Sequence, residues 1–183
     1  MLYKSETAKV RDRILKYCIG DGIDIGCQND KVVENCIGFD RIKTSQVDVV
    51  GDANNLPFDN NHFDYIFSSH CLEDMEDTST TLKEWLRVLK PNGNIILYLP
   101  HKDLYKGCNL DHKRELIETD ITSILEEQNC QIIECFIDDT PPDEKYSFCL
   151  FCSANRDTIN HFPCHYPSII IEAVSKPPES DIF

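Results

Sequence analysis

Four residues between positions 24 and 52 combine the residue types that bind a nucleotide. A short apolar run ends at Asp24 and Gly26, and two further apolar runs end at Asp40 and Asp52. A glycine lets the backbone approach a ligand without a Cβ in the way. Carboxylates accept hydrogen bonds from hydroxyl and amino groups. Ligands of open α/β sheets bind outside the carboxyl ends of the strands, so the spacing predicts a nucleotide pocket at one edge of a sheet.

Hydrophobic patterning in the first half of the chain predicts the elements that position these residues. We expect strands at 22–25, 37–40, 47–50, 62–68 and 94–99, and helices at 4–17 and 78–90 with Thr78 and Ser79 as caps of the second helix. Asp30 is expected to cap a short helix through residue 35. Pro91-Asn92-Gly93 is expected to form a turn. The short connection between Asp40 and Asp52 leaves no room for a full crossover helix.

The second half continues the alternation of strand and helix. We expect a polar loop at 101–113, a helix at 117–128, and two strands at 131–137 and 145–152 around an acidic loop. Residues 1–155 then form one α/β domain with a doubly wound sheet, and residues 156–183 form an extended C-terminal arm.

Composition excludes several classes of partner. The 183 residues carry a net charge of −14, which opposes binding to nucleic-acid phosphates or to an anionic membrane surface. The N-terminal residues lack the apolar core of a signal peptide, and no apolar run is long enough to span a membrane. We therefore expect a cytoplasmic protein.

The ten cysteines are expected to be reduced thiols because no secretory signal is present. Cys149 and Cys152 have the spacing of a redox or zinc pair, yet they fall on a predicted strand, where residues three apart point to opposite faces. His161, Cys164 and His165 lie in the tail without a paired motif elsewhere. We expect no metal site.

Five ordered segments resemble the class I S-adenosylmethionine-dependent methyltransferases, a group that includes small-molecule, quinone and glycan methyltransferases. They are IDIGCQ, the strand ending at Asp40, VVGDANNLPF, HFDYIFSSHCLEDMED and LKEWLRVLKPNGNIILYLPH. The resemblance implies a Rossmann-like, mostly parallel seven-stranded sheet with one antiparallel strand near the edge and helices on both faces. It also implies S-adenosylmethionine as cofactor.

The resemblance assigns roles to individual residues. Asp24 is similar to the acid that orients the amino-acid part of the cofactor, and Asp40 to the carboxylate that takes both ribose hydroxyls. Asp52 resembles the acceptor of the adenine amino group. The full set implied for the cofactor is Asp24, Gly26, Cys27, Asp40, Arg41, Asp52, Ala53, Leu56, Ser68 and Ser69, in which the Ala53 amide meets the adenine ring, Leu56 packs on its face, and the two serines line the methionine portion.

Two departures from the family pattern stand out. Gln28 and Asp30 occupy positions that are usually glycine, and Glu73-Asp74 replaces a common Glu-His pair. The acidic run at 73–77 is most simply a solvated helix start. Trp85 is expected to be a core anchor of its helix.

The sequence thus predicts methyl transfer, by in-line displacement, to a small-molecule or glycan acceptor, most simply to oxygen. A hydroxyl acceptor needs a base, for which His70, His101 and His112 are candidates. Two alternatives remain. One is a dinucleotide-dependent oxidoreductase, although that class wants G-x-G-x-x-G with an acid about twenty residues later. The other is a non-catalytic protein that keeps the methyltransferase fold. The sequence does not indicate an oligomeric state.

Overall fold

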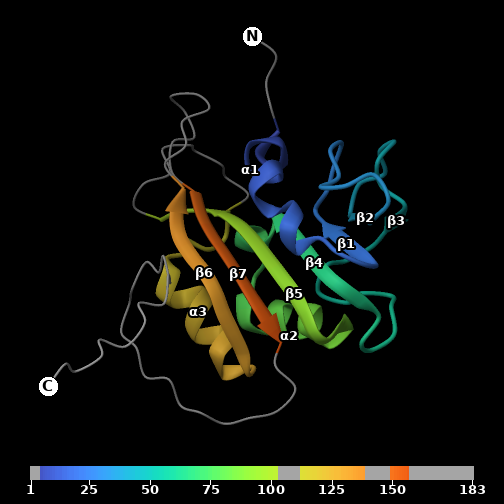
Figure 1. Cartoon of the computed structure of the whole chain (residues 1–183). Helices are drawn as coiled ribbons and strands as arrows, with labels where there is room; N and C mark the ends of the chain where they lie inside the picture. Colours follow the sequence, from blue (N-terminus) through green and yellow to red (C-terminus); the bar gives the residue numbers. More distant parts are fainter. Residues whose placement is uncertain (1–4, 103–111, 139–148, 157–183) are drawn as a thin grey trace, which may run out of the picture.

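The computed structural model describes residues 5–102, 112–138 and 149–156, and in this part of the chain seven strands form one sheet (Figure 1). The strand order is β3-β2-β1-β4-β5-β7-β6. The strands are β1 (Gly22–Ile25), β2 (Ile37–Asp40), β3 (Val49–Val50), β4 (Phe63–Ser69), β5 (Leu89–Pro100), β6 (Cys130–Asp138) and β7 (Cys149–Arg156). The helices are α1 (Glu6–Ile14), α2 (Thr78–Val88) and α3 (Glu118–Glu127), with short 3-10 turns η1 (Leu15–Tyr17) and η2 (Leu72–Asp74).

The directions of the strands confirm the predicted fold class. Neighbouring strands from β3 to β5 run parallel, whereas β7 pairs antiparallel with both β5 and β6. The sheet is therefore mostly parallel, with one antiparallel strand next to its edge. Crossing from β1 outwards to β2 and back to β4 reverses the strand order, and that switch point is where α/β folds bind ligands.

Helices cover both faces of the sheet (Figure 1). One core cluster packs Leu82 and Trp85 of α2 and Leu125 of α3 against strand residues such as Ile23 and Ile25. A second cluster packs Val10 and Ile14 of α1 against Tyr65, Phe67, Ile96 and Tyr98 of the central strands. Because side chains alternate along a strand, each central strand contributes to both clusters. Trp85 is fully buried, as predicted.

Helices α1 and α2 each begin after a residue whose side chain accepts a hydrogen bond from a backbone amide of the first turn. The hydroxyl of Ser5 accepts the amide of Ala8 at the start of α1. The carboxylate of Asp77 accepts the amide of Thr80 at the start of α2, so the cap is Asp77 and the prediction of Thr78 and Ser79 was wrong by one residue.

The predicted short helix after Asp30 is absent from residues 30–36, which form irregular backbone with bends and a turn at 34–35. Its proposed cap has other partners, because the carboxylate of Asp30 accepts hydrogen bonds from the Ser5 hydroxyl and the Arg11 guanidinium. The connection instead packs Val32 and Cys36 directly on the sheet. The Asp30 carboxylate therefore links this segment to α1 instead of capping a helix.

Several strand bounds also differ from the predicted ones: β3 begins at Val49 rather than at residue 47, and β7 ends at Arg156 rather than at residue 152. The strand β5 begins at Leu89, directly after α2, and the pairing shifts from Phe63 with Leu89 to Tyr65 with Asn94. The predicted turn at 91–93 is therefore an irregularity inside β5, where Asn92 has a φ of +62°. The strand β7 starts at Cys149, and residues 145–148 lie outside the described part of the chain, as do the acidic loop from 139 and the arm from 157.

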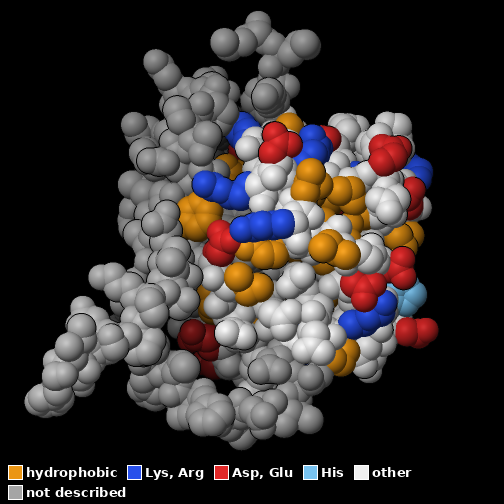
Figure 2. Space-filling model, viewed as in Figure 1, with side chains coloured by type: hydrophobic (Ala, Val, Ile, Leu, Met, Phe, Trp, Pro, Cys, Tyr) orange, Lys and Arg blue, Asp and Glu red, His pale blue; other side chains and the backbone are white. Residues whose placement is uncertain are grey.

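Among the described residues, α1 is the α-helix that covers the central strands on its face of the sheet, and that face exposes some hydrophobic surface. Figure 2 shows hydrophobic side chains there between those of lysine and arginine. The exposed residues include Leu15 and Ile19. The thinner cover follows from the missing helix between β1 and β2.

Candidate functional site

The carboxyl ends of four parallel neighbours, β3, β2, β1 and β4, lie along one edge of the sheet. These ends carry Asp52, Asp40, Gly26 and Ser69. Backbone bonds lock the ends together, since the Gly26 amide donates to the Phe39 carbonyl at 2.8 Å. The strand order therefore places these residues along the same edge of the sheet, as their spacing in the sequence predicts.

The turn after β1 is shaped by two residues with left-handed backbone. Gly26 has a φ of +83°, and a Cβ placed on it would lie 2.7 Å from the Cβ of Cys71. A side chain is therefore excluded at Gly26 by both conformation and space. Gln28 has a φ of +46° and adopts, at some cost, the conformation that glycine would take easily. The backbone of this turn therefore has a left-handed conformation that favours glycine, although Gln28 stands at that position.

Asp40 is buried at the end of β2 and its carboxylate is held in place by two amides. Its Oδ2 accepts the amide of Gln28 at 3.1 Å, and its Oδ1 accepts the amide of Ile42 at 2.9 Å. Each carboxylate oxygen has capacity for a second donor. Asp40 is therefore fixed between the turn after β1 and its own turn, in a position to accept two hydroxyl groups.

Among the residues predicted to bind the cofactor, Asp24 has a buried carboxylate oxygen that accepts no hydrogen bond from the described residues. Its neighbours Ile23 and Ile25 face the α2 and α3 cluster, so the Asp24 side chain faces the α1 side of the sheet. Oδ2 accepts the Val32 amide at 2.7 Å, while Oδ1 is buried and has no hydrogen-bond partner among the described residues. Burial raises the pKa of this carboxyl to about 8. A buried acceptor without a donor is expensive, which points to a missing donor.

The turn after β3 is built around Asp52. Its Oδ1 accepts the backbone and side-chain nitrogens of Asn54, at 2.9 and 3.0 Å. The carbonyl of Ala53 accepts the indole N–H of Trp85 at 2.9 Å, so α2 fixes the turn from behind. Leu56 is buried in the core cluster rather than spread on the surface of the turn.

The remaining members of the predicted cofactor set differ in exposure. Cys27 is buried and Arg41 is exposed. The Ser68 hydroxyl is buried and donates to the Ile25 carbonyl at 2.9 Å, which leaves it a structural role between β4 and β1. The Ser69 hydroxyl is also buried but has no hydrogen-bond partner among the described residues. Ser69 is thus the serine with capacity for a ligand.

Two of the three candidate histidines come together on one carboxylate. The Nδ1 of His70 lies 3.5 Å, and the Nε2 of His112 lies 3.6 Å, from the same Oε1 of Glu73. His101 is separate: its Nε2 lies 3.1 Å from Glu118. The structure therefore brings together His70 and His112 but not His101.

The expectation that residues 73–77 form a solvated helix start is wrong for Glu73. The side chain of Glu73 is fully buried, whereas Glu76 is exposed and Asp77 caps α2. Burial raises the pKa of the Glu73 carboxyl to about 8. The signal in the sequence was the spacing of His70 and Glu73, three residues apart directly after a buried strand.

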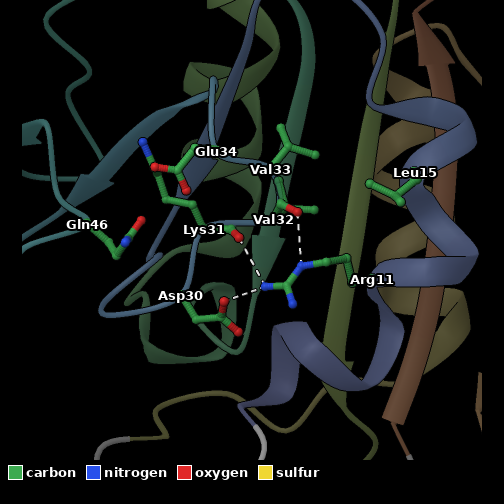
Figure 3. Close-up of a pocket in the computed structure, with 8 residues that line it drawn as sticks. All are labelled: Arg11, Leu15, Asp30, Lys31, Val32, Val33, Glu34 and Gln46. Atoms are coloured by element: carbon green, nitrogen blue, oxygen red, sulfur yellow. Dashed lines mark hydrogen bonds and ion pairs between the residues drawn. The ribbon is translucent and has the colours of Figure 1, made fainter.

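A surface hollow of about 400 Å³ lies on the α1 side of the sheet (Figure 3). The Arg11 guanidinium crosses it and donates to the carbonyls of Lys31 and Val32 as well as to Asp30. The lining residues are Arg11, Leu15, Asp30, Lys31, Val32, Val33, Glu34 and Gln46. None of these residues is a predicted cofactor residue. Inside the hollow the Arg11 guanidinium is already paired with the Asp30 carboxylate, so the carboxyl ends of the strands remain the candidate binding site.

No group of three or more His, Cys, Asp or Glu side chains in the described part of the chain could hold a metal ion. No helix in residues 5–102, 112–138 and 149–156 is long and apolar enough to cross a membrane.

Comparison with known sequences agrees with this arrangement. Residues 13–97 match the family described as "Methyltransferase domain". A demethylmenaquinone methyltransferase of Staphylococcus saprophyticus is 39% identical over 82 residues, which are 41% of this chain and 35% of that protein. A 2-phytyl-1,4-naphtoquinone methyltransferase of Synechococcus elongatus is 29% identical over 157 residues, 75% of this chain and 66% of that protein. The chain thus spans about a third of the demethylmenaquinone relative.

Solved structures share the fold at low identity. A 1,6-didemethyltoxoflavin-N1-methyltransferase of Burkholderia thailandensis, solved with S-adenosylhomocysteine, has a TM-score of 0.66 at 14% identity and covers 84% of this chain and 77% of its own. The [4+2]-cyclase SpnF has a TM-score of 0.63 at 16% identity and covers 81% and 80%. At this identity the likeness establishes the fold alone, and the fold carries more than one chemistry.

Proposed function

We propose that this chain, which belongs by its fold and its domain match to the class I S-adenosylmethionine-dependent methyltransferases, binds S-adenosylmethionine and transfers its methyl group to a small molecule. The observation that carries the proposal is the buried Oδ1 of Asp24, which has no donor among the described residues and lies beside the side-chain-free turn at Gly26. Such an acceptor suits the ammonium group of the cofactor's amino-acid part.

The residues at the strand ends fit the rest of the cofactor. Asp40 is oriented by two amides and retains one acceptor site on each oxygen for the two ribose hydroxyls. The turn at Asp52 and Ala53, braced by Trp85, offers a carboxylate and an amide to the adenine edge. Ser69 supplies a buried hydroxyl near the methionine portion. Cys27, Arg41 and Leu56 belong to the same set as flanking groups.

When bound, the cofactor supplies a sulfonium methyl that a nucleophile can attack in line. The residues of the chain hold the acceptor nucleophile in line with the methyl group of the cofactor. Such proximity and orientation lower the barrier by several kcal/mol. On the acceptor side, His70, His101 and His112 are the candidate bases for a hydroxyl, of which His70 and His112 share a carboxylate neighbour. The sulfonium loses its charge as methyl transfer proceeds, so the site needs no oxyanion hole.

The names of the relatives favour a particular acceptor class. Both sequence relatives described above are named for naphthoquinone-type substrates, and the toxoflavin enzyme also acts on a small ring compound. A small ring compound is therefore our proposed acceptor in preference to a glycan. Oxygen as the methylated atom is proposed only from the candidate histidine bases, because none of these names indicates oxygen and the toxoflavin enzyme is named for a nitrogen.

Transfer of labelled methyl from S-adenosylmethionine to reduced 1,4-naphthoquinone, with a neutral disaccharide in a parallel reaction, tests this function. We expect label in the naphthoquinol and none in the disaccharide. The competing function is a protein that keeps the fold without methyl transfer, for which the cyclase SpnF is a precedent of shared fold. Binding of S-adenosylhomocysteine without transfer to any member of a wider hydroxyl and amine panel would favour that function.

A further inference from the structure

The two oxygens of the Asp52 carboxylate, in the turn after β3, have different surroundings. Asn54 donates twice to Oδ1, from its backbone amide at 2.9 Å and from its side-chain Nδ2 at 3.0 Å. A carboxylate oxygen has two lone pairs, so these two donors occupy Oδ1. Oδ2 accepts no hydrogen bond from any of the described residues. Of the two oxygens, Oδ2 is therefore the one that can accept a ligand donor.

The side chain of Asn54 is itself fixed by Thr81 of α2. The Thr81 hydroxyl is fully buried and donates to Oδ1 of Asn54 at 2.6 Å, and it also lies 2.8 Å from the Asp77 carbonyl. An amide oxygen accepts and cannot donate, so this contact directs the amide oxygen of Asn54 to Thr81 and its nitrogen to Asp52. The reverse orientation would set two acceptor oxygens against each other at Asp52. The hydrogen bonds therefore specify one orientation of the Asn54 amide.

Two further side chains hold the same turn. Nδ2 of Asn54 lies 3.6 Å from Sδ of Met75, the residue that follows η2. Trp85 is four residues after Thr81, on the same face of α2, and its indole N–H donates to the Ala53 carbonyl at 2.9 Å. One face of α2 therefore holds two successive residues of the turn, at positions 53 and 54.

We propose that Asn54 and Thr81 are positioning residues that direct Oδ2 of Asp52 to the 6-amino group of adenine and so select 6-aminopurine nucleosides. This inference rests on the proposed function, in which Asp52 meets the adenine edge. Because Asn54 occupies Oδ1, an amino group that approaches the carboxylate donates to Oδ2. A 6-oxopurine would place an acceptor against that oxygen, and a purine without the 6-amino group would leave it without a donor.

The exposure of Asp52 explains why positioning matters here. The Asp52 side chain lies at the surface of the described structure, where a carboxylate can change its rotamer. Ordering a side chain upon binding costs free energy, and the bonds from Asn54 order this one before the ligand arrives. The benefit is limited to ligands that donate a hydrogen bond to Oδ2. A role in the shape of the turn alone would instead affect every ligand equally.

Calorimetric titration of the full chain with two ligands tests the proposal. One is S-adenosylhomocysteine, and the other is its analogue with hydrogen in place of the 6-amino group. Wild type should bind S-adenosylhomocysteine about tenfold more tightly, the effect of one hydrogen bond to a charged group. Asn54→Ala should reduce this preference to about threefold or less, because the carboxylate is no longer held in one orientation. Asp52→Ala should remove the preference.

Asn55→Ala is the matched control. Asn55 is also exposed, and its side chain makes no hydrogen bond within the described part of the chain, while its backbone amide, which donates to the Asp52 carbonyl, is retained in alanine. This variant should keep the wild-type preference. Thr81→Val removes the buried hydroxyl and should act as Asn54→Ala does. Thr81→Ser retains the hydroxyl and should restore the preference.

The outcomes separate this inference from the proposed function. A wild-type preference that persists in Asn54→Ala, even with weaker binding of both ligands, would overturn the inference, since Asn54 would then only shape the turn. Equal binding of the two ligands by wild type would overturn it and leave the proposed function standing. Binding of neither ligand by folded wild type would refute both. Asn54 is exposed, so Asn54→Ala decides the question if Thr81→Val does not fold.

Discussion

The Cβ position of Gly26 lies 2.7 Å from the Cβ of Cys71. These residues follow the neighbouring strands β1 and β4, so a side chain at Gly26 would collide with the segment after β4. The φ of +83° at Gly26 adds a second reason why no other residue fits there. The proposed cofactor site therefore requires that position 26 has no side chain, in addition to the carboxylates of Asp24 and Asp40.

Gly26→Ala tests this relationship. The substitution should destabilise the protein by about 1–3 kcal/mol, because alanine is strained at this φ and must displace Cys71. It should also abolish binding of S-adenosylhomocysteine. Urea unfolding and calorimetric titration measure the two effects.

Gly20→Ala is the control, since Gly20 has a φ of +92° and its Cβ would meet the Asp64 side chain, away from the strand ends. It should show a comparable loss of stability with binding retained. A folded Gly26→Ala that binds S-adenosylhomocysteine as wild type does would contradict the account.

The strand ends were predictable because their signals are local. Asp24, Gly26 and Asp40 each close an apolar run of strand length, and a parallel sheet necessarily gathers such ends at one edge. The burial of Trp85 followed from its place in the apolar stripe of α2. The antiparallel strand near the edge came from family resemblance and not from any local pattern.

What the sequence did not reveal depends on contacts between distant segments. Asp30 has the type and position of a helix cap, but Arg11 and Ser5, about twenty residues earlier, claim its carboxylate. Glu73 lies in an acidic run typical of a solvated helix start, but η2 is bonded to the segment at 112–114 and the Glu73 side chain is buried.

Trp85→Phe should weaken both the core and the turn that it braces. Phenylalanine keeps most of the ring volume but removes the indole N–H that donates to the Ala53 carbonyl. We expect a loss of about 1–3 kcal/mol, from the lost hydrogen bond to a half-buried acceptor combined with a small cavity. Affinity for S-adenosylhomocysteine should also fall, because Asp52 and Ala53 lose their support. Urea unfolding of both proteins checks the first effect, and an unchanged midpoint would show that the brace is unimportant.

The buried carboxyl of Glu73 predicts a pH-dependent difference in stability. Its pKa is raised from 4.5 to about 8 in the folded protein, so folding favours the protonated form. That stabilisation is complete below about pH 4.5 and is lost as the pH rises towards 8. Glutamine does not titrate. The melting temperature of Glu73→Gln relative to wild type should therefore rise by several degrees between pH 5 and pH 8.5.

Thermal melts of both proteins at constant ionic strength give this difference directly. The contribution of His70 has the opposite sign, because its lowered pKa costs stability as the pH falls below 6.5, and it is common to both proteins. A difference in melting temperature that does not change with pH would mean that the Glu73 carboxyl is solvated and that folding does not change its pKa.

The central claim is that the edge formed by Asp24, Gly26 and Asp40 binds S-adenosylmethionine, and calorimetric titration of S-adenosylhomocysteine tests it most directly. Asp40→Ala is compared with Asp48→Ala, whose carboxylate likewise accepts a backbone amide, that of Gly38, but lies outside the predicted cofactor set. We predict micromolar binding by wild type and Asp48→Ala and none by a folded Asp40→Ala. No binding by folded wild type, or equal binding by Asp40→Ala, would contradict the account.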